Sequence, residues 1–301
     1  MKKKAIKKII SLLLILVVMN CSVNCFKVGA ESNFPTITYD GDVKIISNIP
    51  TEYFQSEQKK RTRSTAIDNF LKEIGYTESQ IMKLSEEDIA EYISAEKIYS
   101  VTKKNTNNGS RAIAIDPLIA KERDKFEGVF SVLQYAQKIN GKTAFRLKTT
   151  IDWTERPFWR LKDIIAMAWT PQALSAGSIR SDYRMTYDEA IYADGNLLEF
   201  NNDVNAISLC EEADYFPCYA VEYDIPTDIL TSIMYSDFHL EAETVVTAEE
   251  DFIACSGYGH QTIAGNPSVS VDTDNTAGIG LDFNYVMDDL YFGTIRVWFS
   301  A

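Results

Sequence analysis

The stretch VFSVLQYAQKI (129–139), NG (140–141) and TAFRLKTTIDW (143–153) decides the fold class. Its two longer runs alternate between apolar and polar residues, and an Asn-Gly pair separates them. Because Asn-Gly supplies the positive φ angles of a type I′ turn, the stretch predicts an antiparallel β-hairpin. On the return strand one face is mostly apolar, and the other face carries Arg146, Lys148, Thr150 and Asp152. We therefore expect one buried face and one face in water.

Further strands are expected downstream of this hairpin. The short apolar stretch 161–169 lies between Pro157 and Pro171, and although its spacing also fits a helix, we favour a buried strand. Other short runs that fit strands, separated by Gly, Pro, Asn and Asp, are 179–187, 219–223, 236–246, 252–263, 268–272, 278–283 and 291–299. Such punctuation predicts a mainly β fold, an antiparallel β-sandwich with a small N-terminal helical segment.

Residues 64–102 form that segment, which we expect to be a short helical bundle or clip. Apolar residues at helical spacing run from Ile67 to Ile74, and Gly75 follows at the position of a C-cap glycine. Thr77 and Ser85 then have the spacing of N-caps for a second and a third helix, the third continuing to Ile98. Helices this short are marginal alone, so the clip should dock on its own β domain or on a partner protein.

The rest of the chain is divided by composition. Residues 31–63 are polar and predict a flexible tether, which ends in a basic cluster at 59–63. Residues 103–111 have the composition of a linker. The pair Asp116-Pro117 then begins a further helix, with Asp as N-cap and Pro in the first turn. We assign 112–301 to that helix and an acidic β-sandwich domain.

The first thirty residues have the grammar of a signal peptide. Five lysines precede an apolar run from Ile9 to Met19, and the small residue Ala30 marks the expected cleavage site. The run is shorter than the roughly 20 residues that span a bilayer, and no second run of that length follows. We expect a secreted protein without a transmembrane segment once residues 1–30 are removed. The alternative is a lipid anchor at Cys21, which Asn20 disfavours because a lipobox carries a small residue there.

Charge is distributed unevenly along the chain. The formal net charge is -13, and residues 188–301 carry 22 acidic side chains against one basic side chain, Arg296. Phosphate would be repelled by this half, so nucleic acid is excluded as its partner. Such an excess of carboxylates suits a cationic partner.

Three cysteines follow the leader: Cys210, Cys218 and Cys255. An odd number outside the cytosol leaves at least one thiol without an intramolecular partner. Cys210 and Cys218 are close enough in sequence for a local disulfide, and the other interpretation is three reduced, buried side chains. With His239 and His260 as the two histidines, a zinc site of the usual Cys/His spacing is absent from the sequence.

The string CSGYGH (255–260) is the most enzyme-like motif. Residues five apart on a strand point to opposite faces, so Cys255 and His260 would meet only across a bulge or turn. We therefore interpret the string as a β-bulge or strand end, not as a nucleophile with its base.

Acid clusters at 211–212, 249–251 and 288–289 are interpreted as a solvated face. Trp153 and Trp298 are expected inside the sandwich core.

A calcium site is a weaker interpretation of one loop. Asp272, Asp274 and Asn275 offer hard oxygen ligands at close spacing. However, Ala277 stands where a calcium loop needs glycine, and the closing glutamate is missing. A hairpin turn between 269–271 and 279–281 accounts for the same residues.

Three segments carry a family resemblance: WTERPFW (153–159), DII (163–165) and YGHQ (258–261). In these segments the chain resembles a group of uncharacterised secreted proteins of low-GC Gram-positive bacteria. The resemblance covers about the last 175 residues. It implies secretion and a β-rich domain, and it implies no activity and no functional residue.

These observations predict a secreted, non-catalytic binding or surface protein. Its partner would be cationic: a basic peptide, a cationic polymer or a metal ion. We assign no catalytic or cofactor-binding residue and expect no cofactor apart from calcium. The alternative function is a secreted hydrolase that acts on polysaccharide through a carboxylate pair.

Overall fold

The computed structural model describes residues 34–58, 64–104, 126–153, 162–175, 182–191, 197–201, 216–225, 233–261, 268–272, 279–284 and 287–299. Thr36–Ala301 forms one compact unit, and it is described here by itself. Of the preceding unit, Met1–Pro35, the described residues are Phe34 and Pro35. The expected signal peptide, its cleavage site and Cys21 lie outside the described residues.

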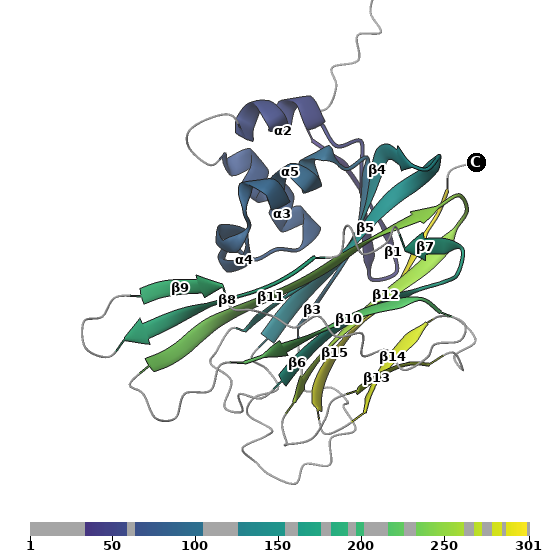
Figure 1. Ribbon diagram of the computed structural model, residues 1–301. Coiled ribbons are helices and arrows are strands. Elements are labelled where there is room, and N and C mark those ends of the chain that lie inside the picture. Colours follow the sequence, from purple (N-terminus) through teal and green to yellow (C-terminus); the bar gives the residue numbers. More distant parts are fainter. Residues whose placement is uncertain are drawn as a thin grey trace, which may run out of the picture. The chain divides into compact units, whose positions relative to one another are not determined.

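The unit is mainly β, with antiparallel strand pairs (Figure 1). Sheet A has nine strands, in the order β1 (Thr36–Asp40), β2 (Val43–Ser47), β3 (Lys97–Lys104), β4 (Phe126–Ile139), β5 (Lys142–Trp153), β11 (Ile233–Ala248), β8 (Asp182–Ile191) and β9 (Leu197–Asn201), with β7 (Ala173–Ser175) also paired to β11. Sheet B has four strands, in the order β10 (Cys218–Asp224), β6 (Lys162–Trp169), β12 (Phe252–Gln261) and β15 (Met287–Val297). Sheet C pairs β13 (Ser268–Asp272) with β14 (Gly280–Asn284).

The largest core lies between sheets A and B. It includes Phe145, Leu147, Ile151 and Trp153 from one face of β5, and Ile165, Met167 and Trp169 from β6. Two sheets that share one apolar core are a sandwich, so the predicted fold class is confirmed. Residues of sheet C pack in smaller clusters with the outward side chains of sheet B, such as Ile164 and Ala166.

The hairpin predicted from the Asn-Gly pair is present. Asn140 and Gly141 have φ angles of 53° and 85°, and Ile139 pairs directly with Lys142. The strand favoured for 161–169 is also confirmed, as β6. A strand suits those residues because β6 is the second strand of sheet B and is almost fully buried.

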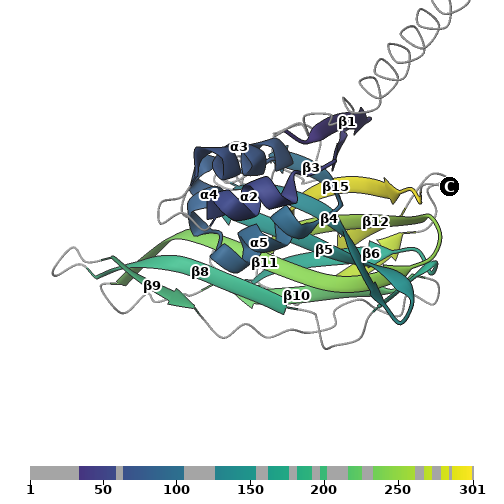
Figure 2. The ribbon, with the colours of Figure 1, turned by 90° about the horizontal axis from the view of Figure 1, so that it is seen from above.

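Four helices form a layer on sheet A, which we call the helical layer (Figure 2). They are α2 (Thr51–Gln58), α3 (Thr65–Ile74), α4 (Glu78–Lys83) and α5 (Glu86–Ser94). The predicted caps are confirmed: Gly75 ends α3 with a φ of 123°, and Thr77 and Ser85 each close a capping box. The third helix ends at Ser94, not at Ile98, because Ile98, Tyr99 and Val101 belong to the buried strand β3.

Part of the expected tether is ordered structure. Residues 36–58 contain β1, β2 and α2, and Phe54 of α2 stacks on Phe70 of α3 with ring centroids 4.7 Å apart. Ile46 and Phe54 are buried, so this segment contributes to the core although its composition is mostly polar. The basic cluster at 59–63, most of the expected linker and the helix expected after Asp116 lie outside the described residues.

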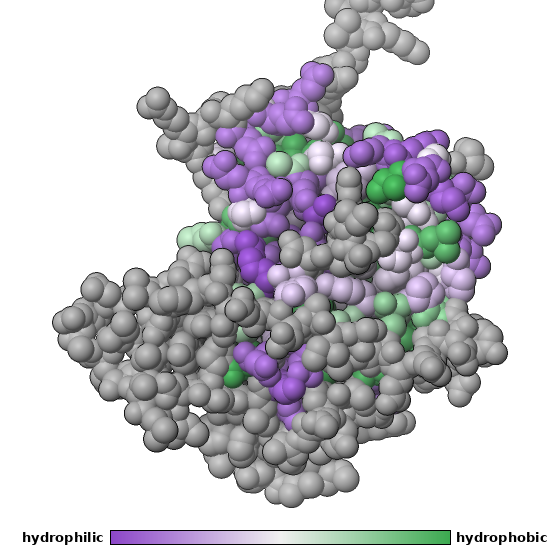
Figure 3. All heavy atoms as spheres, viewed as in Figure 1, coloured by the Kyte–Doolittle hydropathy of each residue, from purple (hydrophilic) through white to green (hydrophobic). Residues whose placement is uncertain are grey.

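The helical layer docks on its own sheet. A second core joins helix residues to strand residues of β2, β3 and β4, namely Ile46, Ile98, Val129 and Leu133. Within the described residues, the predicted helical clip therefore packs on its own β domain. The side of the helical layer visible in Figure 3 is largely hydrophilic. No helix in the described ranges has the length and apolar character that crossing a membrane requires.

Candidate functional site

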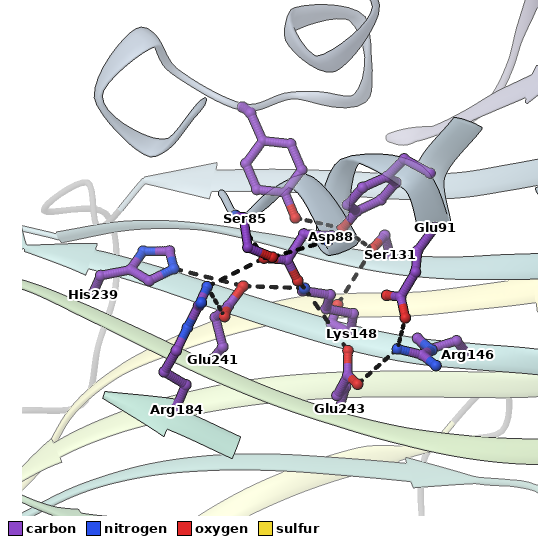
Figure 4. A network of polar contacts seen from close by, with 12 residues as sticks. Ser85, Asp88, Glu91, Ser131, Arg146, Lys148, Arg184, His239, Glu241 and Glu243 are labelled. Atoms are coloured by element: carbon purple, nitrogen blue, oxygen red, sulfur yellow. Dashed lines mark hydrogen bonds and ion pairs between the residues drawn. The ribbon is translucent and has the colours of Figure 1, made fainter. Parts of the chain in front are cut away.

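The polar face of β5 is not in water. Lys148, Thr150 and Asp152 are buried, and the Lys148 side chain is only 2% exposed. The expectation of a wet face is therefore wrong, because the helical layer covers it with α4 and α5 (Figure 4). A buried face of this kind requires partners for every charge.

The neighbouring strand supplies those partners in register. On β11, Glu243 lies opposite Lys148, Glu241 opposite Thr150, and His239 opposite Asp152. On the far side of β11, Glu241 lies opposite Arg184 of β8. The other face of β11 carries Phe238, Leu240 and Ala242, which belong to the sandwich core. Period-two alternation thus brings acids of β11 and bases of β5 and β8 to the same face.

Lys148 is the centre of this network. Its Nζ lies 2.6 Å from Asp88 Oδ1 of α5, 3.1 Å from Glu241 Oε1 and 3.8 Å from Glu243 Oε2. Burial opposes the charge, but Glu241 and the other acidic groups outweigh it and hold the pKa of Lys148 well above its ordinary value. Burial likewise opposes ionisation of Glu241, yet Lys148 and its other partners lower the pKa of that carboxyl. Both side chains are charged at neutral pH.

Asp88 joins the helix cap to the network. Its Oδ2 accepts hydrogen bonds from Ser85 N at 2.9 Å and from Ser85 Oγ at 2.6 Å, and lies 3.3 Å from Arg184 Nη2. The same carboxylate reaches Lys148 through Oδ1. One residue therefore caps α5 and ties it to both β5 and β8.

Two glutamates share one arginine at the other side of the network. Arg146 Nη1 contacts Glu91 Oε1 of α5 and lies 2.7 Å from Glu243 Oε1. Burial and the nearby charge of Glu243 raise the pKa of Glu91 to about 7. The Glu91 carboxyl therefore changes between its protonated and ionised forms near neutral pH.

His239 is enclosed by two carboxylates. Its Nδ1 lies 2.9 Å from Asp152 Oδ1, and its Nε2 lies 3.6 Å from Glu241 Oε1. Burial disfavours the imidazolium, but Asp152 and Glu241 outweigh that effect and raise the pKa of His239 to about 9. Lys83 of α4 reaches the same Asp152 oxygen at 3.3 Å.

The network has the properties of a structural joint. Its side chains come from α4, α5, β5, β8 and β11, and the charges at its centre are almost fully buried. The hydroxyls of Tyr76, Tyr92 and Ser131 extend it toward the apolar part of the helical layer. Because the charges at its centre are enclosed, the arrangement can attach the helices to the sheet and can bind or release protons.

The CSGYGH motif does not form a catalytic pair. His260 Nδ1 lies 2.6 Å from Asp163 Oδ1 in the sandwich core, and Trp153 Nε1 donates to Asp163 Oδ2 at 3.3 Å. Cys255 packs on the opposite side of sheet B with Ala168 and Ile279, where burial raises the pKa of its thiol to about 12. The interpretation that Cys255 and His260 point apart is confirmed. The strand pairing is irregular between Ser256 and Gly257, as a β-bulge requires.

The bulge lies on the partner strand, β15, and reverses which face of the sheet the following side chains point to. Phe292 is the extra residue on β15, and Gly293 beside it has a φ of 88°. Leu290, before the bulge, and Phe292, within it, are buried in the core, and Ile295 and Val297 are buried after it. Trp153 is buried as expected, but the expectation for Trp298 is wrong: its side chain is 45% exposed.

A hollow of about 290 Å³ lies where β1, β2, β3 and β15 come together. Its polar lining includes Asp40, Asp42 and Lys103, and Val43, Val101 and Phe292 supply apolar surface. Lys103 Nζ lies 2.7 Å from Asp42 Oδ2, whereas Asp40 has no ion-pair partner among the described residues. Tyr291, 41% exposed, stands at the same hollow.

The expected calcium loop falls mainly outside the described residues. Asp272 ends β13, where its backbone lies opposite Gly280, while Asp274 and Asn275 are not described. The hairpin strands expected around this loop are present as β13 and β14. Within the described ranges no three His, Cys, Asp or Glu side chains are grouped as metal ligands. Calcium at Asp272, Asp274 and Asn275 therefore stays a prediction.

The cysteines differ in state. Cys218 is disulfide-bonded, and Cys255 is a free, buried thiol. Three reduced cysteines is therefore the wrong alternative. Cys210 lies outside the described residues, so a bond between Cys210 and Cys218 stays a prediction.

The comparisons with known proteins give no family. No family model and no curated protein matches the chain. Three solved structures resemble it weakly. A "Pore forming protein" has a TM-score of 0.32 at 8% identity, over 67% of this chain and 92% of that chain. The C-terminal domain of the Streptococcus agalactiae AgI/II polypeptide BspA has a TM-score of 0.29 at 9% identity, over 58% of each chain. Clostridium perfringens delta-toxin has a TM-score of 0.26 at 8% identity, over 87% of this chain and 95% of that chain. Superpositions at these scores assign neither a family nor a function.

Proposed function

We propose that the chain is a secreted, non-catalytic binding or surface protein that engages a cationic group. The observation that carries the proposal is the hollow at β1, β2, β3 and β15, whose lining includes the acidic residues Asp40 and Asp42. His239, Cys255 and His260, the histidines and the free thiol of the described strands, are fully buried. An accessible hollow with an acidic lining, together with buried imidazoles and thiol, favours binding over nucleophilic catalysis.

The lining of the hollow suits one positively charged side chain. The charge of Asp42 is already paired with that of Lys103. The hydrogen bond and charge interaction with Lys103 lower the pKa of the Asp42 carboxyl, so it stays ionised beside the ammonium. Asp40 remains to pair with an incoming cation. Val43, Val101 and Phe292 can contact the methylene chain of a lysine or arginine. The volume is at the small end of ligand pockets, which fits a single side chain better than a large ligand.

The acidity of the second half supports the same class of partner, because a net negative surface attracts basic peptides or polymers at long range. Part of that acidity is satisfied internally. Glu241 pairs with Lys148, Glu243 with Arg146, and Glu222 with Lys162. Other acids of this half, among them Glu250 and Asp282, are exposed. These exposed acids are the ones that can attract a partner.

Calorimetric titration of the purified chain with a lysine-rich peptide tests the proposal. We expect saturable binding at low salt that weakens as salt is added. Asp40→Asn should reduce the affinity severalfold, whereas Asp282→Asn, an exposed carboxylate outside the hollow lining, should leave it within twofold. A glutamate-rich peptide and calcium are titrated in parallel.

Absence of binding to any cationic probe at low salt would overturn the proposal. Release of reducing sugar from a polysaccharide panel would instead favour the hydrolase. Secretion is tested separately, by locating the chain in the culture medium or in the cell fraction.

A further inference from the structure

The interface between the helical layer and sheet A has two unlike parts. Over β2, β3 and β4 it is apolar, with Phe70, Leu71 and Ile93 of the helices packed near Ile98 and Leu133. Over β5, β11 and β8 it is ionic. The α4–α5 segment (residues 78–94) contributes the helical side of the ionic part, and Ile81, Ile89 and Ile93 place it in the apolar part as well. Its docking therefore depends on charge in addition to apolar packing.

Glu91 lies among like and unlike charges from every element around it. The groups that face it are Arg146 and Lys148 of β5, Glu243 of β11, Tyr135 of β4 and Asp88 of its own helix. Glu91 and Glu243 share Arg146 Nη1. Two ionised carboxylates on one buried guanidinium repel each other, and a proton on one of them removes that repulsion.

His239 lies at the opposite end of the ionic part. It faces Asp152 of β5, Glu241 of its own strand, Lys83 and Gln80 of α4 near Asp152, and Thr186 opposite it on β8. A protonated imidazole satisfies both carboxylates at once. A neutral imidazole leaves Asp152 with Lys83 and removes one of the cations around Glu241.

We propose that the α4–α5 segment is a proton-controlled clamp, in which the proton held by Glu91 favours its docking on β5 and β11 and loss of that proton as pH rises weakens the docking. Opening of the segment would uncover the charged face of β5, β11 and β8 together with apolar side chains of α4 and α5 such as Ile81, Ile89 and Ile93. This device is independent of the hollow and of the proposed binding function.

The direction of the effect follows from proton linkage. Docking buries Glu91 beside Glu243 and raises its pKa from 4.5 to about 7. The docked state therefore binds this proton more tightly than the undocked state. Docking is strongest below about pH 4.5 and weakens as pH rises to about 7. The pKa of His239 is raised by Asp152 and Glu241, which stay beside it on the sheet when the segment opens, so the His239 proton does not drive the opening. Loss of the Glu91 proton changes the opening equilibrium by at most about tenfold per pH unit.

Hydrogen exchange of the whole chain at pH 6 and pH 9, corrected for the intrinsic exchange rate, measures this opening. We expect the opening constant for amides of α5 to rise at least tenfold between the two pH values. Amides of β4 and β5, which lie in the sandwich core, should change less than threefold. Equal change in α5 and β4, or none in α5, would overturn the clamp.

A matched pair of variants separates the clamp from a general loss of stability. Glu91→Gln should flatten the part of the pH response between pH 6 and 7.5, whereas Glu87→Gln, on the exposed side of α5, should retain the wild-type response. A Glu91→Gln response equal to that of the wild type would contradict the proposal.

Discussion

At the scale of single residues, Lys148 depends most on its surroundings. Its ammonium lies among Asp88, Glu241 and Glu243, and almost none of its side chain contacts solvent. Removing an ammonium from water costs several kcal/mol, so a charge in this place requires close carboxylates. Each carboxylate in turn depends on Lys148, because an unpaired buried charge is the most costly outcome.

Lys148→Met should destabilise the fold by about 3–5 kcal/mol, since it leaves buried carboxylates without their central cation. The double variant Lys148→Met with Glu241→Gln should recover part of that loss, because one of the uncompensated charges is removed with it. Urea unfolding monitored by circular dichroism measures both. Lys138→Met, at an exposed position of β4, should stay within about 0.5 kcal/mol of the wild type. A cost for Lys148→Met no larger than that of Lys138→Met would show that the network is not stabilising.

At the scale of elements, local rules account for what the sequence predicts well. The turn at Asn140-Gly141 and the caps at Thr77 and Ser85 depend on residues adjacent in sequence, and all three are present. Alternation predicts a polar face in water for β5, because it separates two faces without saying what covers each. The strand that pairs with Lys148 comes about 90 residues later, and α5 comes about 60 residues earlier.

The ionic network itself left a signal in the sequence. His239, Glu241 and Glu243 repeat on one face of a strand, and Arg146, Lys148 and Asp152 repeat on one face of another. Charges in such rows on long apolar strands indicate a covered face with complementary partners. The prediction for Trp298 fails for a different reason: a single extra residue at the Phe292 bulge reverses which face of the sheet the later residues of β15 point to.

The junction of cap and network in α5 gives a prediction at this scale. Ser85→Ala should cost about 1 kcal/mol, the usual value of a helix N-cap. Asp88→Asn keeps an oxygen that can accept the hydrogen bonds of Ser85 but loses the charge that faces Lys148 and Arg184. It should therefore cost about 2–3 kcal/mol more than Ser85→Ala in urea unfolding. Equal costs for the two variants would mean that Asp88 serves the cap alone.

At the scale of the whole molecule, the fold brings the acidic residues of 188–301 together with basic residues that precede them in the sequence. Lys148, Arg146 and Lys162 come before residue 188, and their partners Glu241, Glu243 and Glu222 belong to the acidic segment 188–301. The acidic excess is therefore in part internal pairing instead of free surface charge. Net charge along a sequence indicates that cations are needed, but it does not say that the chain supplies some of them itself.

Internal pairing on this scale sets how stability responds to acid. In the folded unit the pKa values of Asp88, Asp152 and Glu241 lie below their ordinary values of 3.8, 3.8 and 4.5, because Lys148, His239 and their other cationic partners outweigh the effect of burial. For a lowered pKa the unfolded chain binds protons first, so the stabilisation is present above about pH 4.5 and is lost as pH falls through the folded values. Glu91 acts in the opposite sense, because its raised pKa adds stability as pH falls from about 7 toward 4.5.

The free energy of unfolding should therefore be greatest between about pH 4.5 and 6 and should fall steeply below that window, as urea titrations at pH 3, 5.5 and 8.5 would show. The variant Glu241→Gln should remove part of the acid limb, whereas Asp282→Asn, an exposed carboxylate, should leave it unchanged. An acid limb that is the same in Glu241→Gln and in the wild type would mean that the buried network does not govern the acid response of this fold.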